Sequence, residues 1–313
     1  MSHLYSPVSQ GETRRLTSAD FGSCFFEKAI TSQNMRVAEF WEDRMHRFLS
    51  KNIAGTVLLA TAVFGLSNAA AHADALEKIK ADGKIRVSID PAAPPYSVLD
   101  ETGKFIGSEV DVAQKLAKDW NLELEVVPTA AANRIPYLLS GKTDIVISTL
   151  SITDERKKVI DFSKPYSAIQ IVVGARKDDE LSKIEELVGK QVAVTRGSTN
   201  DTEITKVALP GTNIVRFEDD STSITAILTG QAAYYVTAPA LLTTVNKKDP
   251  SAQIEPRIVL KTNVTGIGAK KGETALTQKL NEWIDASLKD GSLNGLYKTH
   301  FGLDLPAEVT DAN

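Results

Sequence analysis

The stretch from Ser148 to Tyr166 holds the residues that could do chemistry in this chain. Three hydroxyl side chains follow residues 144–147, an apolar run that is typical of a buried strand. Thr153 is placed to cap a helix. The N-terminus of this helix would expose backbone N–H groups and the positive end of the helix dipole, which together attract an anion. Arg156 adds a planar guanidinium that can hold a carboxylate through two parallel hydrogen bonds. The spacing predicts an anion site, although a capped surface helix with a solvated arginine explains the same pattern.

A second junction with polar side chains lies further along the chain. Residues 192–195 have the pattern of a strand, and residues 196–201 would begin the next helix. Backbone N–H groups and the hydroxyls of Ser198 and Thr199 could bind an anion there. A plain capped helix is the default explanation for this pattern alone.

Hydrophobic periodicity places the first junction in a chain of alternating strands and helices. Apolar and polar residues alternate over 85–89 and 122–126, as in strands, and apolar residues recur at helical spacing over 110–120 between them. A short helix over 133–140 then precedes the strand at 144–147. This order predicts an α/β fold with a parallel sheet and helices on both of its faces.

The whole pattern resembles the polar-amino-acid family of periplasmic solute-binding proteins, family 3, the receptors of ABC importers. The resemblance runs from about residue 84 to about residue 308 and rests on the order and spacing of short motifs. These motifs are Pro94–Tyr96, Gly107–Ala113, Asn133–Pro136, Ser140–Asp144, Ser148–Tyr166, Gly189–Val194, Arg196–Thr199, Gly266–Gly268 and Phe301–Gly302. The family implies a two-lobed periplasmic-binding-protein fold (type II, Venus-flytrap), in which two crossover strands form a hinge.

The resemblance also implies how the chain is divided. Residues 74–170 and 266–308 would form lobe 1, and residues 171–265 would form lobe 2. Residues 309–313 would be a tail, and we expect the chain to fray from Pro306 onward. A small ligand would bind between the lobes, where strand ends and helix N-termini converge.

The family pattern gives roles to the residues of the two junctions. Arg156 and the hydroxyls of Thr149 and Ser151 would capture the carboxylate of the ligand on lobe 1. Ser198 and Thr199 on lobe 2 would contact it when the lobes close. Contacts that form only in the closed state shift the equilibrium by that difference in affinity.

The loop from Asp90 to Tyr96 adds two further candidate ligand-binding residues, one at each end. In the family this loop lies on the cleft and supplies an aromatic lid, and Tyr96 fits the second aromatic position. Ala93 stands where the first, stacking aromatic is expected, which predicts a larger or differently shaped pocket.

The sequence departs from the family pattern where a ligand ammonium would bind. Family members that bind α-amino acids carry an aspartate at the position of Ala238. An ammonium buried there would lack its counter-charge, at a cost of several kcal/mol. Either another acid substitutes, or the ligand is not a simple α-amino acid. The candidate acids are Glu109, Asp90, Asp219 and Asp220.

We therefore expect a monomeric receptor, not an enzyme, that captures an amino acid or related small carboxylate by hinge closure. Its partner would be an ABC permease in the inner membrane. Two alternatives stay open: a secreted dehydratase of the cyclohexadienyl type on the same fold, and a sensing receptor without transport. The dehydratase would need a general acid or base in the cleft, and Glu109 is the only candidate.

Composition narrows the classes of function. The chain has 313 residues, 42% hydrophobic and 24% charged, with a net charge of −4, which disfavours nucleic acid as a partner. Cys24 and all the histidines except His300 precede residue 74. After the processing described next, no cysteine nucleophile or histidine cluster would remain, so we expect no metal site and no cofactor.

The N-terminal part has the layout of a secretory signal peptide over residues 45–73. A short basic segment precedes an apolar run, residues 53–66, and small residues flank the predicted cleavage site after Ala73. The run is shorter than the ~20 residues that span a bilayer, so cleavage and a periplasmic location are expected rather than an anchor. Residues 1–44 would be a disordered extension from an incorrectly assigned start, with the initiator at Met45 or Met35.

Overall fold

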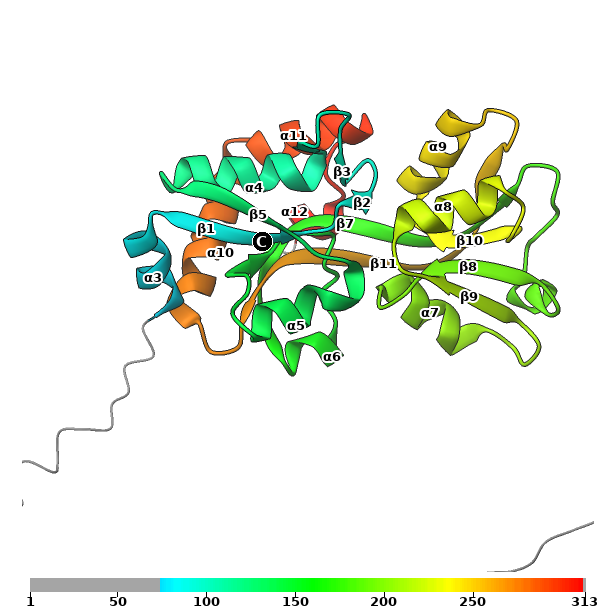
Figure 1. Cartoon of the computed structure of the whole chain (residues 1–313), viewed down its shortest axis with the longest axis horizontal. Helices are drawn as coiled ribbons and strands as arrows, with labels where there is room; N and C mark the ends of the chain where they lie inside the picture. The colour runs from blue at the N-terminus through cyan, green and yellow to red at the C-terminus, as the bar shows by residue number, and fades with distance from the viewer. Residues whose placement is uncertain (1–73, 312–313) are drawn as a thin grey trace, which may run out of the picture. The chain divides into compact units, whose positions relative to one another are not determined.

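The structure is a computed structural model, and it describes residues 74–311 (Figure 1). The expected extension over 1–44 and signal peptide over 45–73 lie outside the described residues. No helix among residues 74–311 has the length and apolar character needed to cross a membrane.

One mixed sheet of eight strands carries the fold, in the order β5-β1-β6-β11-β7-β10-β8-β9. A second, three-stranded sheet has the order β2-β3-β4. The strands are β1 Lys84–Ile89, β2 Ala92–Ala93, β3 Ser97–Leu99, β4 Phe105–Ile106, β5 Glu123–Pro128, β6 Ile145–Val146, β7 Ile160–Arg176, β8 Gln191–Thr195, β9 Asn213–Phe217, β10 Tyr234–Thr237 and β11 Ile254–Lys270. The expected strand over 144–147 is shorter in the structure, because only its two central residues pair as a strand.

Ten helices and two single turns of 3-10 helix connect these strands in the described part of the chain. The helices are α3 Ala75–Asp82, α4 Ser108–Asp119, α5 Arg134–Leu139, α6 Asp154–Lys157, α7 Thr199–Val207, α8 Asp220–Leu228, α9 Pro239–Lys248, α10 Thr274–Lys289, α11 Ser292–Phe301 and α12 Ala307–Thr310. The 3-10 turns are Ala131–Asn133 and Ile184–Leu187.

The two long strands β7 and β11 are the crossover strands. They pair antiparallel along their whole length, from Arg176 opposite Ile254 to Ile160 opposite Lys270. The parallel strands β5, β1 and β6 join the pair on one side, and the parallel strands β9, β8 and β10 join it on the other. The expected parallel sheet is therefore two parallel groups that are linked by an antiparallel pair. This is the type II two-lobed fold, and the lobe limits at 170/171 and 265/266 remain a prediction.

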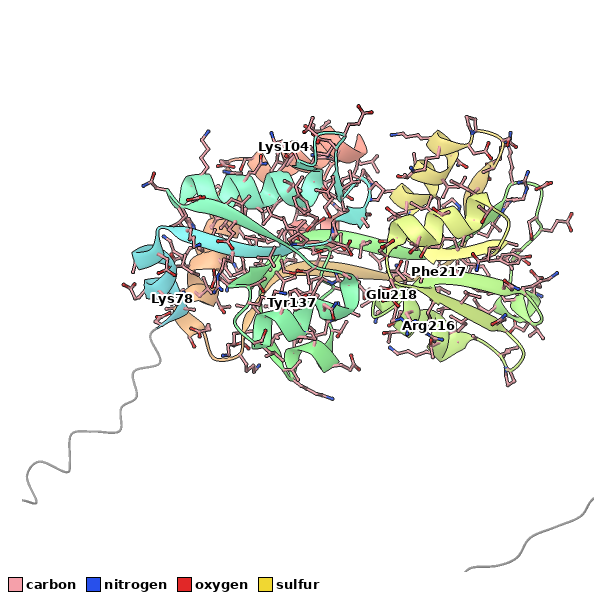
Figure 2. All side chains as sticks on the ribbon, in the orientation of Figure 1. Lys78, Lys104, Tyr137, Arg216, Phe217 and Glu218 are labelled. Carbon is pink, nitrogen blue, oxygen red and sulfur yellow. The ribbon has the colours of Figure 1, made fainter. Side chains whose placement is uncertain are left out.

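Each lobe buries apolar side chains on both faces of its strands. In lobe 1, helices α4, α10 and α11 pack on one face, and α5 packs with Val146 and Ile160 on the other (Figure 1). In lobe 2, α8 and α9 lie on one face and α7 lies on the other. Arg216 in the edge strand β9 (Figure 2) pairs with Asp201 in α7, with Nε and Oδ1 2.8 Å apart.

The chain beyond Pro306 does not fray as we expected. It forms α12, and the Val309 side chain is fully buried in the core of lobe 1. Burial of one apolar side chain of this size stabilises by about 1.5 kcal/mol or more, which is enough to hold a single helical turn in place.

Two glycines in β11 let the stretch from Ser148 to Ile152 lie flat against that strand. A Cβ at Gly268 would be 2.8 Å from Leu150 Cδ2, and a Cβ at Gly266 would be 2.9 Å from Ile152 Cδ1. Backbone hydrogen bonds follow the same approach, from Gly266 N to Leu150 O at 3.1 Å and from Ile152 N to Val264 O at 3.0 Å. The crossover strand therefore sets the position of the first predicted anion site.

Replacing Gly268 by alanine should disturb this packing. Leu150 is buried and has little room to move, so we expect Gly268→Ala to cost about 1–3 kcal/mol of unfolding free energy. Chemical denaturation measures this loss. Gly295→Ala is the matched control, because its Cβ would meet nothing within 4 Å in helix α11, and it should be neutral or stabilising. Equal effects of the two substitutions would contradict the packing argument.

Candidate ligand-binding site

The first predicted site is a short loop that ends in a capped helix. The Thr153 hydroxyl accepts a hydrogen bond from Arg156 N at 3.2 Å, which confirms the predicted cap, although α6 is only one turn long. Arg156 Nη1 donates to Ser151 O at 2.9 Å. No other atom of this guanidinium has a hydrogen-bond partner among the described residues, so donors remain for a ligand. Burial, and then the charge of Arg134, lower the Arg156 pKa to about 9.

Two predicted ligand-binding residues from different lobes meet here. Ser151 Oγ in lobe 1 and Thr199 Oγ1 in lobe 2 are 3.0 Å apart, and both side chains are buried. The structure thus brings the two strand-to-helix junctions together, although they are far apart in the sequence.

Ser198 has the contacts of an ordinary helix cap. Its hydroxyl accepts from Asp201 N at 3.1 Å and donates to Thr195 O at 2.6 Å. These bonds occupy the hydroxyl in the way that the plain-cap explanation expects. A ligand contact of Ser198 remains a prediction.

Thr149 is held in place by a buried carboxylate. Its backbone has φ +47°, and its N–H donates to Glu109 Oε2 at 3.1 Å. The hydroxyl of Tyr166 donates a short hydrogen bond to the same oxygen. Burial of Glu109 raises its pKa. These bonds tie the N-terminus of α4 to the loop and to β7, so Glu109 positions Thr149.

The loop that starts at Asp90 contacts both lobes. Ser221 Oγ in lobe 2 donates to Ala92 O at 3.1 Å, and Thr244 Oγ1 donates to Pro94 O at 3.3 Å. The Tyr96 ring is buried, and its centroid lies 5.4 Å from that of Phe301. The ring therefore packs within the protein, and the role of Tyr96 as a lid over the ligand stays a prediction.

Arg134 is a residue of this region that our reading of the sequence did not identify. Its side chain is 4% exposed, its Nε donates to Ala131 O at 3.0 Å, and its Nη1 donates a short bond to Ser148 O. No carboxylate lies within ion-pair distance of it in the described part of the chain. Burial lowers the Arg134 pKa, and the charges of Asp90, Asp220 and Glu109 partly oppose this effect. A usable signal was present, because Arg134 belongs to a family motif and precedes a buried strand.

Two of the candidate acids are held in the same region. Asp90 is 4% exposed and accepts one hydrogen bond, from Ala92 N at 2.9 Å. Asp220 Oδ1 accepts from the Tyr235 hydroxyl at 2.9 Å and from the Thr195 hydroxyl in a short bond. Burial raises the pKa of both acids, that of Asp220 to about 6, and the nearby charge of Asp90 adds to the effect on Asp220.

The remaining groups have structural contacts. Asp219 caps α8 by accepting from Thr222 N at 2.7 Å. His300 is partly buried, and its Nε2 lies 2.6 Å from Asp111 Oδ2. Within residues 74–311, no three histidine, cysteine or acidic residues are grouped so that they could hold a metal ion.

Comparison with known proteins decides the family. The model of the bacterial extracellular solute-binding proteins, family 3, matches residues 85–303. The chain belongs to this family.

Individual members of the family are clearly similar to this chain. The L-cystine-binding protein TcyJ of Escherichia coli (strain K12) is 32% identical over 233 residues, 74% of this chain and 87% of that protein. The glutamine-binding protein of Geobacillus stearothermophilus is 35% identical over 207 residues, 64% of this chain and 78% of that protein.

Solved structures agree with the sequence comparison. The P235GK mutant of ArgBP from T. maritima is 33% identical and superposes with a TM-score of 0.68. The alignment covers 73% of this chain and 100% of that one. The ancestral amino acid-binding protein AncCDT-1, a precursor of cyclohexadienyl dehydratase, is 31% identical, with a TM-score of 0.66 and coverage of 73% and 100%. Both comparisons support the type II fold.

The raised pKa of Glu109 implies that its contribution to folding stability depends on pH. Its folded-state pKa lies above the unfolded value of 4.5, so its contribution to stability is complete below pH 4.5 and is lost as the pH rises through the folded-state pKa. Glu109→Gln keeps an acceptor for Thr149 and Tyr166 but cannot become charged. We therefore expect this variant to gain melting temperature relative to wild type as the pH rises from 4.5 to 8.

The control for this measurement is Glu101→Gln, which changes the same charge in an exposed turn. Its melting temperature should follow that of wild type across the pH range. A constant difference between Glu109→Gln and wild type at every pH would contradict the assigned direction of the Glu109 pKa.

Proposed function

We propose that this protein is the periplasmic substrate-binding receptor of an ABC importer and that it captures an amino acid between its two lobes. The observation that carries the proposal is the meeting of Ser151 and Thr199 beside the free donors of Arg156. Hydroxyl donors from both lobes and one guanidinium form a site for a carboxylate. Thr149, Ser198, Asp90 and Tyr96 complete the proposed set.

The choice of an amino acid rests on the relatives. Those named above bind cystine, glutamine and arginine, and the histidine-binding periplasmic protein of Escherichia coli is also similar. Each of these ligands has an α-carboxylate, which suits the Arg156 site. The cleft also holds buried acids that could meet an ammonium.

Closure of the lobes couples ligand capture to delivery. The hydrogen bonds from Ser221 and Thr244 to the loop after Asp90 can form only when the lobes meet. A ligand held by Arg156 and Thr199 together stabilises this closed state by its differential affinity. We propose that an inner-membrane permease reads the closed state and that the receptor is a monomer in the periplasm.

We propose binding without turnover. AncCDT-1 is named as a precursor of a dehydratase, so the fold is compatible with an enzyme. In this chain, however, the candidate acid Glu109 is already engaged by Thr149 and Tyr166. Incubation with prephenate and arogenate should therefore give no product.

Removal of the Arg156 guanidinium tests the carboxylate site. Arg156→Ala should weaken binding by about 2–5 kcal/mol, because the carboxylate loses its charge partner inside a closed cleft. Isothermal titration with L-cystine, L-glutamine, L-arginine and L-histidine, on protein refolded to remove carried-over ligand, measures the loss. Arg196→Ala is the control, since that side chain is 52% exposed and pairs with Glu218. Wild-type affinity in Arg156→Ala would overturn the assignment.

A pair of glycines in lobe 2 tests closure itself. Gly197 and Gly230 both have positive φ, +71° and +72°, so alanine should cost each about 1 kcal/mol of stability. A Cβ at Gly197 would lie 2.8 Å from Ala132 Cα in lobe 1, whereas a Cβ at Gly230 would meet nothing within 4 Å. Only Gly197→Ala should therefore weaken ligand binding, by about tenfold or more. Equal affinities of the two variants would count against closure at this contact.

A further inference from the structure

The position that the family resemblance assigns to a ligand ammonium carries only a methyl group in this chain, at Ala238. Ala238 is fully buried at the start of α9. Its neighbours Val236 and Thr237 are also buried, and neither is acidic. A ligand cation in the cleft must therefore find its counter-charge elsewhere.

Asp220 is built to present one free carboxylate oxygen. The hydroxyls of Thr195 and Tyr235 both donate to Oδ1, which leaves Oδ2 without a hydrogen-bond partner among the described residues. Thr195 lies at the end of β8 and Tyr235 lies in β10, so two strands of lobe 2 fix the direction of the side chain. Because the orientation is fixed before the ligand arrives, binding does not have to pay the entropy cost of ordering this side chain.

Asp90 presents a second free oxygen from lobe 1. Its Oδ1 accepts from Ala92 N at 2.9 Å, and its Oδ2 has no hydrogen-bond partner within residues 74–311. Burial and the charge of Asp90 raise the pKa of Asp220, and Arg134 acts on both acids only from beyond ion-pair distance. Neither carboxylate has a cation within ion-pair distance in the part of the chain that is described. The donors of Arg134 that form bonds are directed at the carbonyls of Ala131 and Ser148 instead.

We propose that Asp220 of lobe 2, together with Asp90 of lobe 1, binds the cationic nitrogen of the ligand in place of an acid at Ala238. This inference rests on the proposed function and adds the residue that determines specificity for a cationic group. A positive charge between these two carboxylates would offset the effect of the Asp90 charge on Asp220 and would give each acid the ion partner that it lacks. Because one acid comes from each lobe, the ligand cation would also favour the closed state.

The other two candidate acids do not suit this role. Asp219 caps α8, and its Oδ1 accepts from both the N–H and the hydroxyl of Thr222, so its carboxylate is directed at the first turn of its own helix. Glu109 receives Thr149 N and the Tyr166 hydroxyl on one oxygen and lies at the start of α4 in lobe 1. Among the described residues, the Glu109 side chain forms hydrogen bonds only within lobe 1, to Thr149 and Tyr166.

Asp220→Asn tests the assignment with the same isothermal titration. Asparagine keeps an acceptor for Thr195 and Tyr235 and removes only the charge. We expect a loss of affinity of about 30-fold or more for those of L-cystine, L-glutamine, L-arginine and L-histidine that bind wild type. The 2-hydroxy acid analogues of the same probes, which lack the α-ammonium, should bind wild type and Asp220→Asn within about threefold of each other.

Two further variants serve as a charge control and as a second test of the proposed site. Asp178→Asn makes the same change of net charge on lobe 2 at a side chain that is 83% exposed, and it should leave all affinities unchanged. Asp90→Asn should repeat the Asp220→Asn result, which protects the test if one variant does not fold. A loss for both L-arginine and L-glutamine would support binding of the α-ammonium. A loss for L-arginine alone, shared by its 2-hydroxy analogue, would mean that the acids bind a side-chain cation and would overturn their assignment in place of an acid at Ala238.

The outcomes separate this inference from the proposed function. If wild type binds a probe and Asp220→Asn binds it equally well, the assignment of Asp220 is wrong while the receptor function stands. If wild type binds none of the probes, the proposed function fails, and the inference fails with it.

Discussion

The antiparallel pairing of β7 with β11 is the constraint on which the rest of the structure depends. Both strands run through both lobes, so the two parallel groups of strands are joined by this one antiparallel pair. The same strand β11 carries Gly266 and Gly268, which let the loop with Thr149 and Ser151 lie against it. The hinge includes β11 and the proposed binding loop packs against β11, so a change in this strand should affect both.

Charged side chains gather where the lobes meet, and the described residues do not neutralise them by direct ion pairs. Arg134 and Asp90 are buried within lobe 1, and Asp220 approaches from lobe 2. Burying charges without partners costs stability, and a fold selected for stability alone would place apolar groups here. The zwitterionic ligand that we propose would provide a compensating charge for each sign, which would account for the retention of these charges.

Many of the strands, helices and caps could be predicted from the sequence, because they depend on local patterns of residues. Alternating and helical spacing placed the strands and helices of lobe 1, and Thr153 before two acids predicted a cap that the structure confirms. The fray expected after Pro306 was wrong, because burial of Val309 depends on a core assembled from distant segments. The motif that contains Arg134 was visible in the sequence, but its position near Asp90 and Asp220 depends on the tertiary structure, because these acids come from other parts of the chain.

The sequence by itself determined the family, the two-lobed α/β fold and the types of residue at both strand-to-helix junctions. These follow from motif order and from hydrogen-bonding patterns that span a few residues. Only the tertiary structure decided that Ser151 meets Thr199, that Glu109 is used to hold Thr149, and that Asp220 keeps one oxygen free. Those facts depend on which surfaces of the two lobes come together, and short-range patterns carry no information about contacts between residues that are distant in the chain.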